Sequence, residues 1–403
     1  MFGLGQKWVF YLLEGLNAFG CSYYFNYLFF YLRDTFGFGN KENLAICAFH
    51  GLIYAIGSWQ GGKFVAKIGQ IRALRIGFTG MAVFLAAGVY LSSYLPFIFL
   101  ILIGWTISMC LIWPSIESLV SDNEPAEKIP SMVGIYNVVW AAGSAISYFI
   151  GGAIYEHLGR LSLFWFPPII HIGQLLILGI ALRKIINTEN HSQNPKEQSP
   201  SETNEKPVDK STAEKFLRMA WIANPFAYVA MNTILAVIPE LAKRHGLNPT
   251  QTGLFCSIWF FARFAAFIVL WRWTGWHYKF GWLITAYLML IGGFITILIV
   301  PQLWIICLAQ IAFGWAVGLF YYSSLYYAMD VGEAGAEHGG LHEAAIGIGI
   351  LVGPAIGSIS LYTMPDKPHI STYSIAILLT CSMIWLVAVY LKGTGKNAAC
   401  QKL

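Results

Sequence analysis

Runs of apolar residues long enough to cross a lipid bilayer dominate this sequence. A membrane-spanning helix needs about 20 predominantly apolar residues to cross the hydrocarbon core. Of the 403 residues, 57% are hydrophobic and 11% are charged, whereas soluble domains average about 45–50% and 25%. We therefore predict an all-α polytopic membrane protein that is embedded in a lipid bilayer. The twelve transmembrane helices that we predict are 8–32, 43–65, 71–93, 96–119, 130–155, 161–183, 215–241, 250–273, 278–300, 302–327, 340–362 and 370–391.

A polar segment, 185–213, separates the first six predicted helices from the last six. After Ile186 it has hardly a large apolar side chain and is rich in Pro, Glu, Ser, Asn and Lys. Such a composition cannot bury enough surface to offset the entropy of ordering the chain. We predict a solvated linker between an N-terminal six-helix bundle, 1–184, and a C-terminal six-helix bundle, 214–403.

The two halves carry traces of an internal repeat. A shift of 209 residues places Leu32, Gly37 and Cys47 on Leu241, Gly246 and Cys256 without a gap. A shift of 206 residues places Gly143 and Gly151 on Gly349 and Gly357. Two bundles related by duplication imply a cavity where they meet, near the membrane midplane.

The basic residues indicate an orientation. If the N-terminus is cytoplasmic, 18 of the 25 Lys and Arg residues lie on the cytoplasmic side and 6 on the other, with Arg263 inside a helix. Cytoplasmic loops carry the excess of Lys and Arg, so we predict that both termini and the linker are cytoplasmic. The net charge of +5 does not indicate nucleic-acid binding, because the basic residues lie in loops between apolar runs.

With its two sets of six helices, cytoplasmic termini and long central loop, the chain resembles the major facilitator superfamily of secondary transporters over nearly its whole length. The superfamily signature between helices 2 and 3 is roughly G-x-x-x-D-R-x-G-R-R. Here Gly62, Lys67, Gly69 and Arg72 match its glycines and basic residues, but Ala66 stands at the acidic position. In the family that acid pairs with basic residues to latch the cytoplasmic side. The resemblance also implies a monomer in a bacterial inner membrane.

Small residues recur in the fifth and eleventh predicted helices. Drug/proton antiporters of the superfamily carry G-x-x-x-G-P-x-x-G-G in helix 5, and only part of that pattern is present here. Small residues at every fourth position let helix backbones approach closely in membranes. We expect both stripes to lie where the two bundles meet; they comprise Gly143 and Gly151, and Gly349, Gly353, Pro354 and Gly357.

Arg263 lies near the middle of the eighth predicted helix, in SIWFFARFAAFIVL. An ionisable residue inside a membrane is costly and is a functional candidate by default. We expect Arg263 to face a wet cavity and to meet an anion, either a protein carboxylate or a substrate.

Two places offer groups for proton coupling. Glu14 starts a polar stripe on the first helix that continues with Asn17, Cys21 and Tyr24 at helical spacing and is typical of a cavity lining. A buried Glu can exchange protons near neutral pH, unless a neighbouring Arg neutralises it. His342 and Glu343 open the eleventh helix and can titrate as a pair between about pH 5 and 8. A solvated gate is the alternative role for this pair.

Further polar and aromatic residues are candidates for contact with a substrate. Polar side chains deep in membrane helices often form hydrogen bonds between helices, and aromatic side chains often serve packing alone. The candidates are Asn137, Asn232, Gln310, Trp259 and Tyr321, together with Asn17 and Tyr24 from the stripe on the first helix. Pro225 and Pro239 also predict a break or a kink in the seventh helix.

We interpret the chain as a carrier that moves a small organic solute by rocking two bundles about a central site, with protons as the coupling ion. Arg263 favours a solute with an anionic or hydrogen-bond-accepting group, whereas the aromatic content favours an amphipathic or sugar-like one. An uncoupled facilitator, a sodium-coupled symporter and a transporter-like scaffold are alternatives. The sequence has no nucleophile elbow, HExxH or Gly-rich phosphate loop, so we predict no enzyme activity, cofactor or metal.

Overall fold

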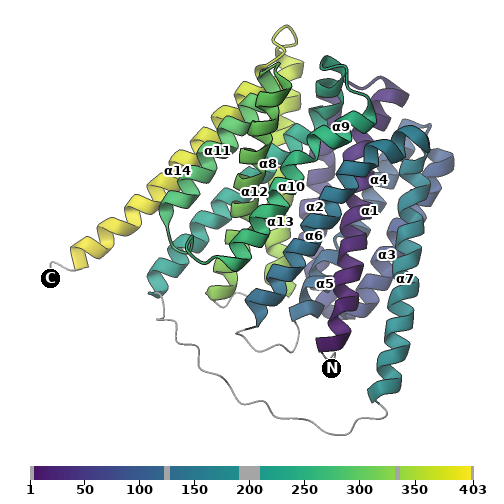
Figure 1. The fold of residues 1–403 in the computed structure, drawn as a ribbon, viewed down its shortest axis with the longest axis horizontal. Helices are drawn as coiled ribbons and strands as arrows, with labels where there is room; N and C mark the ends of the chain where they lie inside the picture. The colour runs from purple at the N-terminus through teal and green to yellow at the C-terminus, as the bar shows by residue number, and fades with distance from the viewer. Residues whose placement is uncertain (1–3, 122–127, 190–208, 332–335, 401–403) are drawn as a thin grey trace.

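The computed structural model describes residues 4–121, 128–189, 209–331 and 336–400, and these residues form fourteen helices and no strand (Figure 1). The helices are α1 (Leu4–Phe36), α2 (Asn40–Ile68), α3 (Gln70–Leu91), α4 (Leu95–Met109), α5 (Ile112–Ser121), α6 (Ile129–His157), α7 (Ser162–Glu189), α8 (Lys210–Arg244), α9 (Pro249–Cys256), α10 (Ile258–Arg272), α11 (Phe280–Ile299), α12 (Leu303–Asp330), α13 (Ala336–Thr363) and α14 (Ile370–Cys400).

Two pairs of helices each make a single span, so that the fourteen helices form twelve traverses. α4 and α5 together cover Leu95–Ser121, and α9 and α10 together cover Pro249–Arg272. Within the described residues, 10 spans are long and apolar enough to cross a membrane. The two traverses outside that set are α1 and α2, whose polar side chains lower their mean hydropathy. The predicted all-helical, twelve-span fold is confirmed.

The helices extend somewhat beyond the predicted spans. α7 continues to Glu189 and α8 begins at Lys210, so both helices run into the predicted linker 185–213. Residues 190–208 of that linker lie outside the described residues. α8 is one continuous helix through Pro225 and Pro239, so the prediction of a break is wrong. Neighbouring helices can satisfy the backbone groups that a proline frees inside a membrane helix.

In Figure 1, α1 to α7 lie on one side of the molecule and α8 and α10 to α14 on the other, while α9 extends over the side of α1 to α7. The starts of α1 and α8 and the ends of α7 and α14 lie at the same end of the molecule, the lower end in the figure. We call this the linker end and the opposite one the far end. Each half crosses the molecule an even number of times, so it begins and ends at the same end.

Close helix contacts join the two halves. α2 packs against α13 so tightly that a Cβ added at Gly51 would lie 2.3 Å from the backbone nitrogen of Leu351. α6 packs against α9 and α10, and a Cβ at Gly152 would lie 2.0 Å from the carbonyl oxygen of Pro249. Glycine is therefore required at both places, since no side chain fits between the backbones.

The glycine stripes lie mainly inside the halves, which corrects our expectation that they line the boundary between them. A Cβ at Gly143 would lie 2.6 Å from the carbonyl oxygen of Gly15, on α1. A Cβ at Gly349 would lie 2.2 Å from that of Pro225, on α8. Gly143 and Gly349, which the 206-residue shift aligns, thus occupy matching places, each against the first helix of its half. Spacing along one helix does not reveal which neighbour the small residues face.

The remaining predicted packing residues are divided between the halves and their boundary. Gly151 faces Tyr27 on α1, and Gly353 faces Val229 on α8. Gly357 lies between Ser371 of α14 and Leu44 of α2, and Pro354 is buried within α13. Gly62 approaches Gly340 across the α2–α13 contact, and Gly69, with φ of 87°, ends α2.

Candidate functional site

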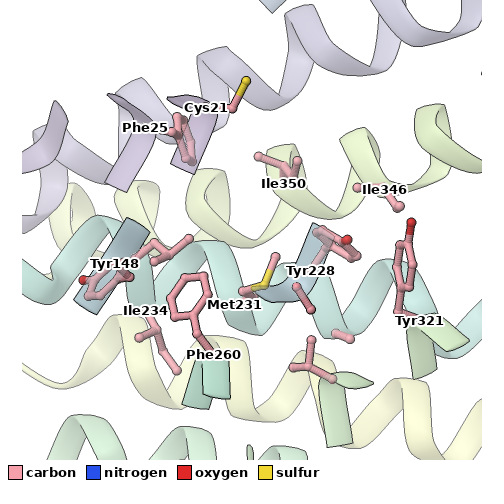
Figure 2. Close-up of a cluster of buried hydrophobic side chains, with 14 of the residues drawn as sticks. Cys21, Phe25, Tyr148, Tyr228, Met231, Ile234, Phe260, Tyr321, Ile346 and Ile350 are labelled. Carbon is pink, nitrogen blue, oxygen red and sulfur yellow. The ribbon is translucent and has the colours of Figure 1, made fainter. Parts of the chain in front are cut away.

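A cavity of about 140 Å³ lies between the two halves of the molecule. Helices α1, α2, α4, α5 and α6 line it from one half, and α8, α10, α12 and α13 line it from the other. Figure 2 shows a cluster of buried apolar side chains that includes part of this lining, such as Phe25 from α1, Met231 from α8 and Ile350 from α13. Both halves therefore contribute to one central site, as the repeat predicted.

Arg263 lines this cavity from α10, and its side chain is buried. Its guanidinium carbon lies 4.4 Å from the ring centre of Trp140, which belongs to α6 in the other half. The rings of Phe260 and Trp259 lie at 5.1 Å and 5.4 Å. Among the described residues, the hydrogen bond from Nη1 to the sulfur of Met231, 3.6 Å long, is the only one, and there is no ion pair. The protein carboxylate that could have paired with Arg263 is therefore not among the described residues.

Glu343 is the acidic residue in the cavity lining. Its Oε2 accepts a hydrogen bond from the hydroxyl of Tyr54 on α2, which ties α13 to the other half. Its Oε1 lies 3.7 Å from Nδ1 of His342. The other ring nitrogen of His342 lies 2.8 Å from Oγ of Ser324 and 3.1 Å from Nδ2 of Asn224, inside the second half. The structure thus brings the predicted pair together, but only Glu343 lines the cavity.

The polar stripe on α1 lies mostly behind the cavity. Cys21 lines the cavity and its thiol lies 3.5 Å from Oδ1 of Asn17, while Tyr24 packs edge-on against Trp105 at 4.7 Å. Glu14 and Asn17 are fully buried, and within the described part of the chain neither carboxyl oxygen of Glu14 has a hydrogen-bond partner. A buried carboxyl group without a partner is costly when it is ionised. Glu14 does not line the cavity, but because its buried carboxyl group lacks a partner it remains a candidate for proton coupling.

Glu117 on α5 joins these acidic groups. Charge interactions connect its carboxyl group with those of Glu14 and Glu343, so that the three repel one another when ionised. A Cβ at Gly339, near the start of α13, would lie 3.7 Å from Oε2 of Glu117. The acids come from α1, α5 and α13, and their proximity could not be inferred from positions 14, 117 and 343 in the chain.

The three predicted amides lie in different surroundings. Asn232 lines the cavity, and its Nδ2 donates to the carbonyl oxygen of Tyr228 one turn earlier. Asn137 and Gln310 are buried outside the lining, and the oxygen and nitrogen of both side chains have no hydrogen-bond partner among the residues that the structure describes. Asn137 follows Tyr136, which does line the cavity.

Aromatic rings make up much of the cavity wall. Of the three predicted aromatic residues, Trp259 and Tyr321 line it and Tyr24 does not. Tyr321 stacks on Trp140 with ring centres 5.1 Å apart, and Trp259 lies 5.7 Å from Phe313 in an edge-on arrangement. These rings pack against each other as well as facing the cavity, so packing and ligand contact are compatible here.

Several lining residues escaped the sequence reasoning. They include His50, Tyr54, Trp140 and Met231. His50 lies 2.9 Å from Oγ1 of Thr106 through its Nδ1. Of these residues, His50 had a usable signal, since a histidine within an apolar run calls for a partner; a Trp or Met in a membrane helix is ordinary.

Hydrogen bonds between the halves gather along the cavity and at the far end of the molecule. At the far end, Nη1 of Arg33 donates to the carbonyl oxygen of Pro239 at 2.6 Å. The hydroxyl of Thr250 donates to Glu156 at 2.6 Å, and that of Ser358 donates to the carbonyl oxygen of Lys41 at 2.8 Å. Among the described residues, we find no such bond between the halves at the linker end. These three bonds tie the two halves together at the far end.

The fold has close counterparts among solved structures. A bacterial homologue of the human lysosomal transporter Spinster, in an inward-facing, unoccupied conformation, has a TM-score of 0.64 and 12% identity, covering 95% of this chain and 94% of that one. The nucleoside transporter NupG has a TM-score of 0.68 and 12% identity, covering 96% and 99%. The human organic anion transporter MFSD10 has a TM-score of 0.64 and 13% identity, covering 94% and 98%. At these identities the likeness shows the fold alone.

A family model provides the sequence evidence. No curated protein matches the chain. The model of the Major Facilitator Superfamily, however, matches residues 10–224, which is more than half of the chain. The many apolar helices and this match make the chain an integral, multi-pass membrane protein and a transporter. The chain belongs to the major facilitator superfamily.

Proposed function

We propose that this protein is a secondary transporter that moves a small organic solute by alternating access, with the central cavity as the solute site and protons as the coupling ion. Arg263 carries the proposal for the site. It is buried where both halves meet, and no carboxylate among the described residues pairs with it. A buried charge in a membrane is retained where it meets a counter-charge or serves a transport path.

Glu343 supports the proposal of proton coupling. When ionised, its carboxylate can only accept hydrogen bonds, and it accepts one from Tyr54 of the other half. A protonated Glu343 can donate instead, so proton binding changes a contact that joins the halves. Proton binding also relieves the repulsion from Glu14 and Glu117. His342 lies against the same carboxylate and is the partner through which a proton can be shared.

The alternatives stay within the same architecture. An uncoupled facilitator or a sodium-coupled symporter would use the same cavity without a proton step, and a scaffold would not depend on the cavity at all. We further propose a monomer in a bacterial inner membrane with both chain termini in the cytoplasm. The excess of Lys and Arg at the linker end supports this orientation.

The experiment is uptake into liposomes that contain the purified protein, with a panel of labelled sugars, amino acids and organic acids. We expect at least one solute to enter faster than in empty liposomes. We expect Arg263→Ala to abolish that uptake, whereas Arg272→Ala, an exposed arginine on the same helix, should retain it. Wild-type uptake by a folded Arg263→Ala variant would remove Arg263 from the solute site.

Proton coupling is tested by imposing a pH gradient across the same liposomes. We expect the gradient to drive accumulation of the solute above its external concentration. Glu343→Gln should abolish accumulation while equal exchange of labelled for unlabelled solute continues, because the amide cannot exchange protons. Accumulation that follows a sodium gradient instead, or no accumulation under either gradient, would establish one of the two alternative carriers.

A further inference from the structure

We propose that the solute of the central cavity is a monovalent organic anion with a small, flat, apolar body, such as an aryl carboxylate or sulfonate, and that its acidic group binds Arg263. The inference rests on the proposed function, whose solute site it specifies. It follows from three properties of the cavity: the charge that has no partner, the rings that surround it, and the volume available.

The first property is the unsatisfied guanidinium. Arg263 has 2% of its surface exposed, and its Nε has no hydrogen-bond partner among the described residues. The hydrogen bond that Nη1 donates goes to the sulfur of Met231, and a thioether is a weak acceptor. A buried cation needs an anion or strong acceptors to offset its lost hydration. The planar fork of donors on a guanidinium matches a carboxylate, which can accept two parallel hydrogen bonds.

The charge on the opposite wall argues against a cationic solute. Glu343 is the acidic residue among the residues that line the cavity, and it already has Tyr54 and His342 as neighbours. His50, also in the lining, is engaged with Thr106. The charge that still lacks a partner is therefore the positive one on Arg263. A second negative charge on the solute would have no second cation to meet, since Arg263 is the only Lys or Arg among the described residues that line the cavity.

The second and third properties define the body of the solute. Trp140, Phe260 and Trp259 surround the guanidinium, with ring centres 4.4 to 5.4 Å from its carbon. Aromatic walls favour flat apolar groups, which stack or pack edge-on. The cavity holds about 140 Å³, and an apolar cavity of about 150 Å³ in another protein takes up benzene. A single ring with one acidic substituent fits both limits.

The test measures binding to the purified full-length protein by calorimetry, with probes that share one ring and differ in charge. Benzoate and benzenesulfonate are the anions, benzamide is the neutral match of benzoate, and benzylammonium is the cation. We expect both anions to bind at least about tenfold more tightly than benzamide, since a hydrogen bond to a charged group contributes that much or more. Equal binding of benzoate and benzamide, preferred binding of benzylammonium, or no binding of either anion would overturn the proposal.

Variants locate the binding. Arg263→Gln should weaken benzoate about 30-fold and leave benzamide unchanged, because it removes one charge-assisted pair. Arg272→Gln is the matched control and should bind as wild type does, although its guanidinium also lies over a tryptophan ring, at 4.9 Å from Trp271. The comparison of benzoate with benzamide on the wild-type protein needs no variant and stands even if Arg263→Gln fails to fold.

The outcome separates this inference from the proposed function. If a sugar or an amine is transported in an Arg263-dependent manner and no aryl anion binds, the transporter proposal stands and the anion proposal fails. If benzoate binds through Arg263 but no solute crosses the liposome membrane, the anion site stands and the transport proposal fails.

Discussion

His277, in the loop between α10 and α11, is the residue outside the membrane spans whose protonation is most clearly linked to folding. Its ring stacks on that of Tyr326 at 4.0 Å and lies 4.5 Å from that of Trp276. Burial lowers the pKa of His277 from 6.5 to about 4, against the opposing charge of Asp330. The folded state therefore favours the neutral imidazole.

This shift predicts a loss of stability in acid. A histidine whose pKa is lower in the folded state contributes stability that is complete above pH 6.5 and is lost as the pH falls toward about 4. We expect the melting temperature of the detergent-solubilised protein to fall over this range, and to fall less in His277→Gln. His157→Gln, which replaces an exposed histidine, should follow the wild type. Identical pH profiles for His277→Gln and the wild type would exclude the link.

The sequence alone predicted that Arg263 needs an anion. The free-energy cost of a charged side chain in a membrane follows from its depth, and the length of the apolar run around Arg263 gives that depth. The sequence could not predict which ring or carboxylate would surround Arg263. Trp140 comes from the other half of the chain, and Glu14, on a recognisable polar stripe, lies behind the cavity. Periodicity identifies a buried face of a helix but not the neighbour that covers it.

At the scale of elements, the contact between α2 and α13 depends on positions without side chains. A Cβ at Gly51 would lie 2.3 Å from the backbone of α13, and one at Gly347 would lie 2.5 Å from the backbone nitrogen of Ala55 on α2. Backbone atoms cannot move aside as the end of a long side chain can. The two helices can keep this approach only while both positions remain glycine.

We therefore expect Gly51→Ala to separate the two helices and to destabilise the protein by about 1–3 kcal/mol, the usual cost of overpacking. Thermal unfolding in detergent measures the effect. Gly292→Ala on α11 is the control, since a Cβ there meets nothing within 4 Å and alanine favours a helix. A melting temperature for Gly51→Ala equal to that of Gly292→Ala would show that the contact is not tight.

Element boundaries were largely predictable, because the spans are set by the thickness of the bilayer and by the polar residues that end them. The breaks at 110–111 and at Ser257, which divide two spans into α4 and α5 and into α9 and α10, were not predicted. The contacts of the glycine stripes were not predicted either. Gly143 and Gly349 pack within their own halves, whereas Gly51 and Gly347, which belong to no evident stripe, pack between the halves.

At the scale of the whole molecule, hydrogen bonds join the two halves at the far end. Removing one far-end bond should favour the conformation that is open there. We expect Arg33→Gln, which removes the bond to Pro239, to raise the labelling rate of Cys21 about fivefold, since about 1 kcal/mol shifts a two-state equilibrium by that factor.

The measurement adds a membrane-impermeant maleimide to the far-end face and follows the Cys21 peptide by mass spectrometry. Arg160→Gln is the control, because Arg160 is an arginine at the same end that contacts Asp34 of its own half. Equal rates in all three proteins would mean that the bond to Pro239 does not hold the far end closed.

Under the proposed alternating access, the bonds that favour closure of the far end also have a kinetic consequence for flux in the absence of a gradient of the coupling ion. The ratio of maximum rate to half-saturation concentration must then be the same in both directions, since otherwise the cycle would pump without a source of energy. The maximum rate and the half-saturation concentration can each differ between the two directions, as long as their ratio is the same. An empty carrier that rests with its far end closed returns quickly after releasing solute at the far face and slowly after releasing it at the linker face. Flux that starts at the linker face should therefore have the higher maximum rate and, in the same proportion, the higher half-saturation concentration.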